Sequence, residues 1–217
     1  MKLKESLLLY AVTDRRWLKA GQSLPDVVRL AVEGGSTMIQ LREKELDREQ
    51  TIEEALEIKS FLNAKNIPLI IDNDIEIAKR VGADGVHVGQ DDCPVSEARK
   101  LLGKDFIIGA TAHNAAEAVK AEEDGADYLG VGAAFGSSTK ADAKAIISLD
   151  EYKKIPEAVS IPVVAIGGID ETNIMRLKGL GLSGFAVVSA IFARDDLRAA
   201  AERMKKLAMH AVTLPLL

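Results

Sequence analysis

The sequence contains a single cysteine, Cys93, among 217 residues, so neither an internal disulfide nor a zinc site built from several cysteines can form. No hydrophobic run approaches the ~20 residues that a membrane-spanning helix requires. The opening stretch carries Glu5 and leads into an apolar run that is too short for a signal peptide. We therefore expect a cytoplasmic protein without a membrane partner.

The chain also lacks a basic stripe. Its formal net charge is -5, and residues of both signs are mixed throughout, which argues against a nucleic-acid partner. An anionic ligand must then be held by a few well-placed groups rather than by the field of the whole molecule. Hydrophobic residues make up 47% and charged residues 28%, which is typical of a packed globular protein. The sequence is compatible with a homo-oligomer and does not fix its size.

Short β-branched runs alternate with longer stretches of helical periodicity, and there are eight of each. The runs are apolar on both faces, as in a parallel sheet covered by helices. With about 27 residues per unit, this alternation predicts an α/β fold, a single (β/α)8 TIM barrel domain spanning 1–217. An open doubly wound sheet is the alternative. The predicted strands are 7–12, 38–41, 69–71, 85–88, 106–110, 128–131, 162–166 and 185–188.

A repeat accompanies the even-numbered strands. Gly82-Ala83-Asp84 precedes the fourth strand, and Gly125-Ala126-Asp127 precedes the sixth. The glycines are expected to end the preceding helices in a left-handed conformation. The repeating unit is therefore predicted to be two βα pairs taken four times.

Polar residues follow the predicted strands, where the active sites of such barrels lie. After the second strand, alternation in extended backbone directs Gln40, Arg42 and Lys44 to one side. An amide, a guanidinium and an ammonium group suit an anion with many oxygens. The alternative is a self-neutralising surface run of charges at a helix start.

Two acidic clusters follow the third and fourth strands. Asp72, Asn73 and Asp74 form the first cluster, and Asp91 and Asp92 form the second. Such clusters facing each other repel unless a cation lies between them, and magnesium suits oxygen ligands that leave room for water and phosphate. The alternative for the first cluster is a helix N-cap.

The segment 132–144 after the sixth strand is long and rich in small hydroxyl residues, which predicts a mobile cover over the site. Ser137, Ser138 and Thr139 can bond phosphate oxygens, and Lys140 can neutralise charge on a departing phosphate. The alternative is a solvated loop without a ligand.

The seventh and eighth strands end in a pattern typical of phosphate binding. Gly167 and Gly168 let the backbone approach an anion, and free amide groups beside Ser189 can donate to it. Close packing is the alternative for the glycines. We expect His87 to pack within the fourth strand, and His113 lies nearer the mouth without an identifiable nucleophile beside it.

With these residues in place, the chain resembles the thiamine phosphate synthase family from about Leu9 to Ala193. The resemblance rests on five strings: Gln40-Leu41-Arg42-Glu43-Lys44, Ala83-Asp84-Gly85-Val86-His87-Val88-Gly89-Gln90-Asp91-Asp92, Ser138-Thr139-Lys140, Ile166-Gly167-Gly168-Ile169 and Val188-Ser189-Ala190-Ile191. It implies condensation of 4-amino-5-hydroxymethyl-2-methylpyrimidine diphosphate with a plain or carboxylated thiazole phosphate, giving thiamine phosphate and diphosphate.

The resemblance also implies roles for individual residues. The pyrimidine diphosphate is assigned to Gln40, Leu41, Arg42, Glu43, Lys44, Thr111 and Lys140. Asp72 is also assigned to substrate binding. The thiazole phosphate is assigned to Ser137, Ser138, Thr139, Gly168, Val188 and Ser189. Arg42, Lys44 and Lys140 take the catalytic role, since they would stabilise charge on the leaving diphosphate together with Mg²⁺.

The magnesium ion is assigned to Asn73 and Asp92. The family usually has Asn followed by Asp at the end of the third strand, whereas this chain has Asp72 followed by Asn73. Asn73 can offer a neutral carbonyl oxygen, and Asp72 or Asp74 stays open as the ligand in its place.

Three other functions stay open beside the synthase. A thiazole tautomerase on the same barrel needs only the phosphate loops and a base, for which His113 is the candidate. It has no diphosphate to hold, so Arg42, Lys44 and Lys140 disfavour it. A different phosphate-binding isomerase or lyase and a non-catalytic binding module are the remaining alternatives.

Overall fold

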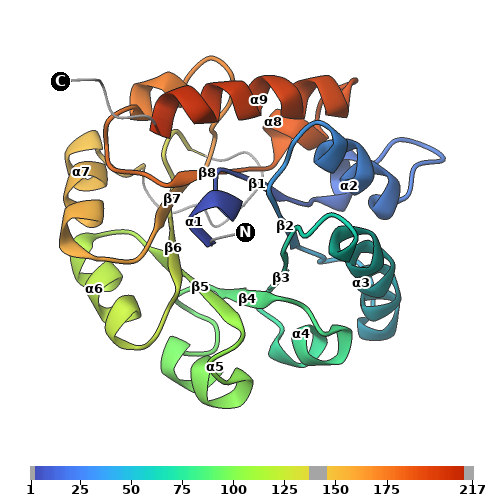
Figure 1. The fold of residues 1–217 in the computed structure, drawn as a ribbon, viewed down its shortest axis with the longest axis horizontal. Coiled ribbons are helices and arrows are strands. Elements are labelled where there is room, and N and C mark those ends of the chain that lie inside the picture. The colour runs from blue at the N-terminus through green and yellow to red at the C-terminus, as the bar shows by residue number, and fades with distance from the viewer. Residues whose placement is uncertain (1–2, 137–145, 213–217) are drawn as a thin grey trace.

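The computed structural model describes residues 3–136 and 146–212, and the strands in this part form one closed parallel barrel in chain order (Figure 1). The (β/α)8 barrel predicted from the sequence is thereby confirmed. The strands are β1 (Leu9–Val12), β2 (Met38–Leu41), β3 (Leu69–Asp72), β4 (Gly85–Val88), β5 (Ile107–Ala112), β6 (Tyr128–Val131), β7 (Val163–Ile166) and β8 (Gly184–Val187).

Helices surround the barrel and cover its outer face (Figure 1). They are α2 (Leu24–Glu33), α3 (Arg48–Asn63), α4 (Ile75–Val81), α5 (Val95–Leu102), α6 (Ala115–Glu123), α7 (Leu149–Ala158), α8 (Ser189–Phe192) and α9 (Leu197–Val212). The short helix α1 (Leu3–Ser6) precedes β1, and the 3-10 turns are η1 (Arg15–Trp17) and η2 (Ile174–Leu177). Within the described ranges, none of these helices is long and apolar enough to cross a membrane.

The connection between β7 and β8 differs from the eightfold alternation that the sequence predicts. It contains only the 3-10 turn η2 instead of an α-helix. Glycines with positive φ lie on both sides of this turn, at Gly168 and Gly179.

Alternation along each strand divides the apolar residues into two cores. The inner core fills the barrel and includes Tyr10, Met38, Ile70 and Tyr128, all of them almost fully buried. The outer core lies between the strands and the helices. Leu3 of α1 packs against the inner core, and Figure 1 shows α1 across the centre of the ring of strands. Because α1 directly precedes β1, it closes the amino-terminal end of the barrel.

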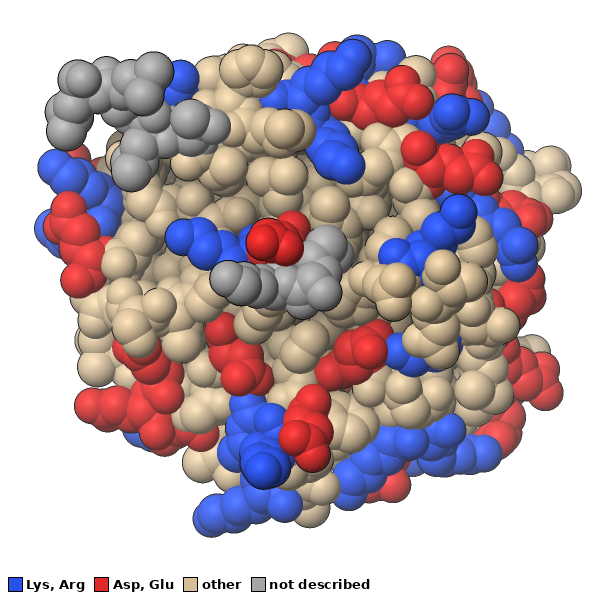
Figure 2. All heavy atoms as spheres, viewed as in Figure 1, with Lys and Arg blue, Asp and Glu red and all other residues tan. Residues whose placement is uncertain are grey.

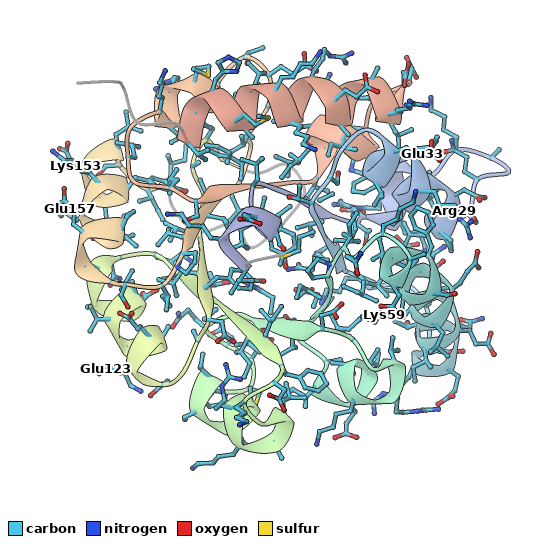
Figure 3. All side chains as sticks on the ribbon, viewed as in Figure 1. Arg29, Glu33, Lys59, Glu123, Lys153 and Glu157 are labelled. Atoms are coloured by element: carbon cyan, nitrogen blue, oxygen red, sulfur yellow. The ribbon has the colours of Figure 1, made fainter. Side chains whose placement is uncertain are left out.

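The aspartates of the Gly-Ala-Asp repeat join neighbouring strands. Asp84 accepts hydrogen bonds from the Leu69 backbone N at 2.7 Å and from Lys59 Nζ at 2.6 Å; Lys59 is labelled on α3 in Figure 3. Asp127 likewise accepts hydrogen bonds from the Ile108 backbone N at 2.7 Å and from an Arg99 guanidinium nitrogen at 2.6 Å. Each aspartate therefore ties the start of a strand to the strand before it and to a helix.

The surface has the mixed charge that the composition predicts. Basic and acidic side chains are interspersed on the face shown in Figure 2.

Gly82 ends α4 in the left-handed conformation, with φ 63° and ψ 41°, as the repeat predicts.

Candidate active site

A cavity of about 610 Å³ opens at the carboxyl ends of the strands. Most of the residues that the sequence predicts for the site line this cavity. They are Gln40, Arg42, Glu43, Lys44, Asp72, Asn73, Asp92, Thr111, Gly168, Val188 and Ser189. Residues from strands on all sides of the barrel therefore meet in one space, as parallel strands in a closed ring require.

Among the described residues, Leu41 is the predicted site residue that does not line the cavity. The side chain of Leu41 is 1% exposed and belongs to the outer core, because strand alternation directs it away from the barrel interior. Ser137, Ser138, Thr139 and Lys140 lie outside the described residues.

The cations after β2 face carboxylates. Lys44 Nζ lies 3.1 Å from Asp72 Oδ2, and the Arg42 guanidinium lies 3.9 Å from the same oxygen and 3.7 Å from Asp14 Oδ2. Buried Arg42 Nε has no hydrogen-bond partner among the described residues. A buried donor without a partner is costly, and a carboxylate oxygen, Asp72 Oδ2, lies 3.9 Å from this atom.

Glu43 organises the loop that carries these cations. Its Oε1 accepts hydrogen bonds from the backbone N atoms of Lys44, Glu45 and Leu46, and its Oε2 accepts one from Arg15 Nε at 2.7 Å. Burial raises the pKa of Glu43, but the hydrogen bonds from Glu45 and Arg15 outweigh it, and the net pKa is lowered. The ionised carboxylate therefore fixes the shape of the loop.

The acidic cluster after β3 divides between two roles. Asp74 caps α4 by accepting from the Ile77 backbone N at 2.9 Å, so the N-cap alternative applies to this residue. Asp72 and Asn73 instead line the cavity. Asn73 has φ 65°, a left-handed conformation that asparagine tolerates better than most residues.

Asp92 faces the same space from the loop after β4. Its Oδ2 accepts a hydrogen bond from the Gly89 backbone N at 2.7 Å. Within 3–136 and 146–212 it forms no ion pair, in contrast to Asp72. No group of three or more His, Cys, Asp or Glu side chains in these ranges is arranged to hold a metal by itself.

The two glycines after β7 continue the sheet into the loops. Gly167 O accepts a hydrogen bond from the Phe135 backbone N at 2.9 Å. Gly168 has φ 66°, and a Cβ atom there would lie 2.1 Å from Gly136 O. Both the conformation and the contact therefore require glycine at 168.

Several residues at the cavity were not predicted as functional. Asp14, which is 4% exposed, lies two residues after the end of β1, and its position after a strand is the signal that could have found it. Tyr10 lies at the cavity floor, where it was indistinguishable from a core residue. His87, which we expected to pack, hydrogen-bonds Tyr128 Oη at 3.1 Å and Thr111 Oγ1 at 3.0 Å.

His113 also lines the cavity, and its Nδ1 lies 2.8 Å from Glu117 Oε2. Burial raises the pKa of Glu117, but hydrogen bonds from the His113 side chain and backbone outweigh it and lower the net pKa. The pair fixes the orientation of the imidazole ring beside the cavity.

Comparison with known proteins supplies the family. Residues 9–191 match the family described as "Thiamine monophosphate synthase". A thiamine-phosphate synthase of Ruminiclostridium cellulolyticum is 46% identical over 204 residues, covering 94% of this chain and 96% of the relative. One of Chloroflexus aurantiacus is 48% identical over 199 residues, covering 92% and 91%.

A solved structure agrees with these relatives. The thiamine phosphate pyrophosphorylase of Pyrococcus furiosus has a TM-score of 0.88 and 35% identity, covering 98% of this chain and 100% of the other. The comparisons favour a transferase of thiamine biosynthesis, and they do not favour the tautomerase alternative. The chain belongs to the thiamine monophosphate synthase family.

Proposed function

We propose that the cavity joins 4-amino-5-hydroxymethyl-2-methylpyrimidine diphosphate to a thiazole phosphate and releases diphosphate. The observation that carries this proposal is the convergence of two separate anion-binding regions on one cavity. Arg42 and Lys44 extend from β2, and Gly168 and Ser189 lie at the ends of β7 and β8. One region suits a diphosphate, and the other suits a single phosphate.

The pyrimidine diphosphate is assigned to the β2 side of the cavity. Arg42 and Lys44 hold the diphosphate oxygens, and Gln40 and Thr111 supply hydrogen bonds to the same substrate. The Arg42 side chain lines the cavity and is 16% exposed, which supports this assignment. Asp72 lies beside both cations and holds them in place before the substrate arrives.

The thiazole phosphate is assigned to the side of the cavity formed by the ends of β7 and β8. The backbone at Gly168, the Ser189 hydroxyl and backbone N–H groups in the first turn of α8 can donate to its oxygens. Val188 lines the cavity next to this turn. Ser137, Ser138 and Thr139 are proposed to complete this phosphate site.

The reaction breaks the bond between the pyrimidine methylene carbon and the diphosphate oxygen, and the electron pair leaves with the diphosphate. The lone pair of the thiazole nitrogen then forms the new carbon–nitrogen bond. No protein nucleophile is required. Arg42, Lys44 and Lys140 stabilise the negative charge that grows on the leaving group, which is the usual way in which fixed charges lower such a barrier.

The donors at the cavity fit Mg²⁺, a hard cation that binds a few protein oxygens and completes its shell with water and substrate oxygens. The Asp92 carboxylate, which forms no ion pair with the described residues, and the Asn73 carbonyl oxygen are the proposed ligands. When bound, the ion would neutralise part of the diphosphate charge. Asp72 is already paired with Lys44, which makes it the weaker candidate.

Diphosphate release tests the proposal. The protein is incubated with both substrates and Mg²⁺, and each component is omitted in turn. Release that requires all components supports the synthase. Release without the thiazole phosphate would indicate a hydrolase, and no release with everything present would contradict the proposed function.

A further inference from the structure

The segment that follows β1 holds the loop that follows β2 at two points. Thr13, which is fully buried, accepts a hydrogen bond from the Arg42 backbone N at 3.0 Å through its hydroxyl oxygen. Two residues further on, Arg15 Nε donates to Glu43 Oε2 at 2.7 Å. Two consecutive residues of the β2 loop are therefore held by one short segment, the first through its main chain and the second through its carboxylate.

Arg15 is itself held by a second carboxylate, which comes from α3. One of its terminal guanidinium nitrogens lies 2.7 Å and 2.6 Å from the two carboxylate oxygens of Glu54. The side chains of Glu43 and Glu54 are 3% and 13% exposed, and that of Arg15 is 22% exposed. A guanidinium presents its donors in a rigid planar fork, so Arg15 occupies a fixed position between a helix and the loop.

The two carboxylates repel each other unless Arg15 lies between them. Burial raises the pKa of Glu54, the hydrogen bond and charge of Arg15 lower it, and the charge of Glu43 raises it, with a net rise. Removing the cation from such a set leaves charges that have lost their hydration without a partner, which is costly. Without Arg15, the Glu43 carboxylate is therefore expected to turn away from its present position.

The order of the β2 loop depends on that position. Glu43 Oε1 accepts hydrogen bonds from the backbone N atoms of Lys44 at 2.8 Å, Glu45 at 2.7 Å and Leu46 at 3.2 Å. A carboxylate that binds Arg15 through one oxygen keeps the other oxygen directed at these three N–H groups. The contact with Arg15 is thus transmitted to Lys44, which lines the cavity.

We propose that Arg15, held by Glu54, is a positioning residue that keeps Glu43 in the orientation that orders the β2 loop, and so places Lys44 for the diphosphate before the substrate arrives. This inference rests on the proposed function and adds a residue that acts through another side chain. A cation that is already in place binds its anion more tightly, because less conformational freedom is lost on binding. The rival explanation is direct contact between Arg15 and the anion, since Arg15 also lines the cavity.

The first experiment measures the order of the loop in the protein alone. Hydrogen exchange at the backbone amides of Lys44, Glu45 and Leu46 is followed by NMR without ligand. Arg15→Ala is expected to speed exchange at these amides about tenfold, because their hydrogen bonds to Glu43 open more often. Unchanged exchange would overturn the proposal.

The second experiment separates positioning from direct contact by the sign of the effect. The affinity for inorganic diphosphate without Mg²⁺ is measured by isothermal titration calorimetry for Glu54→Ala. Glu54 is not among the described residues that line the cavity. Loss of the carboxylate that holds Arg15 is expected to weaken binding about threefold. If Arg15 contacted the anion directly, removing a competing carboxylate would tighten binding, so unchanged or tighter binding would overturn the proposal.

A double-mutant cycle tests whether Arg15 acts through Glu43. Arg15→Ala is expected to weaken diphosphate binding about tenfold in wild type and by less than about twofold in the Glu43→Gln background, because the second variant has already lost the link. An equal loss in both backgrounds would overturn the proposal. If Arg15→Ala does not fold, Glu54→Ala provides the test in its place, since alanine is the strongest helix former and residue 54 lies within α3.

Glu57→Ala is the matched control. Glu57 lies on the same helix, its side chain is 56% exposed, and it pairs at 3.3 Å with Arg29, which is labelled on α2 in Figure 3. This variant changes the net charge as Glu54→Ala does, and its loop exchange and diphosphate affinity should equal those of wild type. A fall in affinity equal to that of Glu54→Ala would overturn the proposal. The exchange experiment requires no ligand, so failure of the proposed function, seen as no diphosphate release by wild type, is distinguishable from failure of this inference.

Discussion

The ammonium nitrogen of Lys44 lies 3.1 Å from Asp72 Oδ2, and the Asp72 side chain is only 7% exposed. The carboxylate thus competes with any anion that approaches Lys44. Asp72→Asn is expected to raise the affinity for inorganic diphosphate in the absence of Mg²⁺ by about fivefold, because a partly exposed ion pair is worth up to about 1 kcal/mol. Isothermal titration calorimetry measures this affinity.

Asp74→Asn is the control for this change. Asp74 caps α4 and pairs with exposed Arg48, and asparagine is an equally good N-cap. The Asp74→Asn variant should bind diphosphate with the same affinity as wild type. Weaker binding by Asp72→Asn would show that the carboxylate supports the anion rather than competing with it.

Arg42 is predicted to stabilise the departing diphosphate. Arg42→Ala should lower kcat/KM by about 10² or more, the scale expected for loss of one group that stabilises charge in the transition state. Arg48→Ala removes the same group from an exposed position that pairs with Asp74, and it should retain near wild-type kinetics. Steady-state assays of both variants would refute the role of Arg42 if their rates were similar.

Asp127 joins strand, helix and strand at the amino-terminal side of the barrel. Asp127→Ala leaves the Ile108 backbone N and the Arg99 guanidinium without this partner, and should lower the free energy of unfolding by about 1–3 kcal/mol. Urea denaturation measures this change. Asp124→Ala, which breaks an exposed pair with Lys120, should cost far less. KM for both substrates should stay constant, since neither aspartate lines the cavity.

The Glu43 carboxylate, in the loop after β2, makes the stability of the folded protein depend on pH. Its folded-state pKa is lowered from the ordinary value of 4.5, so the folded protein binds fewer protons here than the unfolded chain. The stabilisation is therefore present above pH 4.5 and is lost as the pH falls through the lowered pKa. Glu43→Gln should cost about 2 kcal/mol at neutral pH.

Unfolding free energies of Glu43→Gln and wild type should converge in acid. Exposed Glu45→Gln changes the same charge in the same loop and should run parallel to wild type over the whole range. A constant difference between Glu43→Gln and wild type down to the most acidic pH would contradict the assignment.

The strand positions were predictable because each strand is covered on both faces. Three strands, β2, β4 and β6, begin and end at the predicted residues. The same alternation predicted that Gln40, Arg42 and Lys44 share one side, and all three line the cavity together with Glu43. It could also have shown that Leu41 points away from the cavity, but the resemblance to the family had assigned it with its neighbours.

The features of the site that could not be predicted from the sequence depend on contacts between distant parts of the chain. Tyr10 and Tyr128 are separated by 118 positions, and each follows the pattern of a core residue. Their hydroxyl pair arises only when the ring of strands closes. Asp72 and Asp74 have the same chemical type and neighbouring positions, and only the backbone turn at Asn73 directs one to the cavity and the other to a helix end.

Gly168 shows how a position can tolerate no substitution for a reason that is independent of ligand binding. A side chain at this position would clash with the carbonyl oxygen of Gly136, which belongs to the adjoining loop. Any residue larger than glycine would push two neighbouring segments of main chain apart before a substrate entered. Loss of activity on replacing this glycine is therefore no measure of phosphate affinity, and inhibitors designed around that position should be judged by their contacts with Ser189.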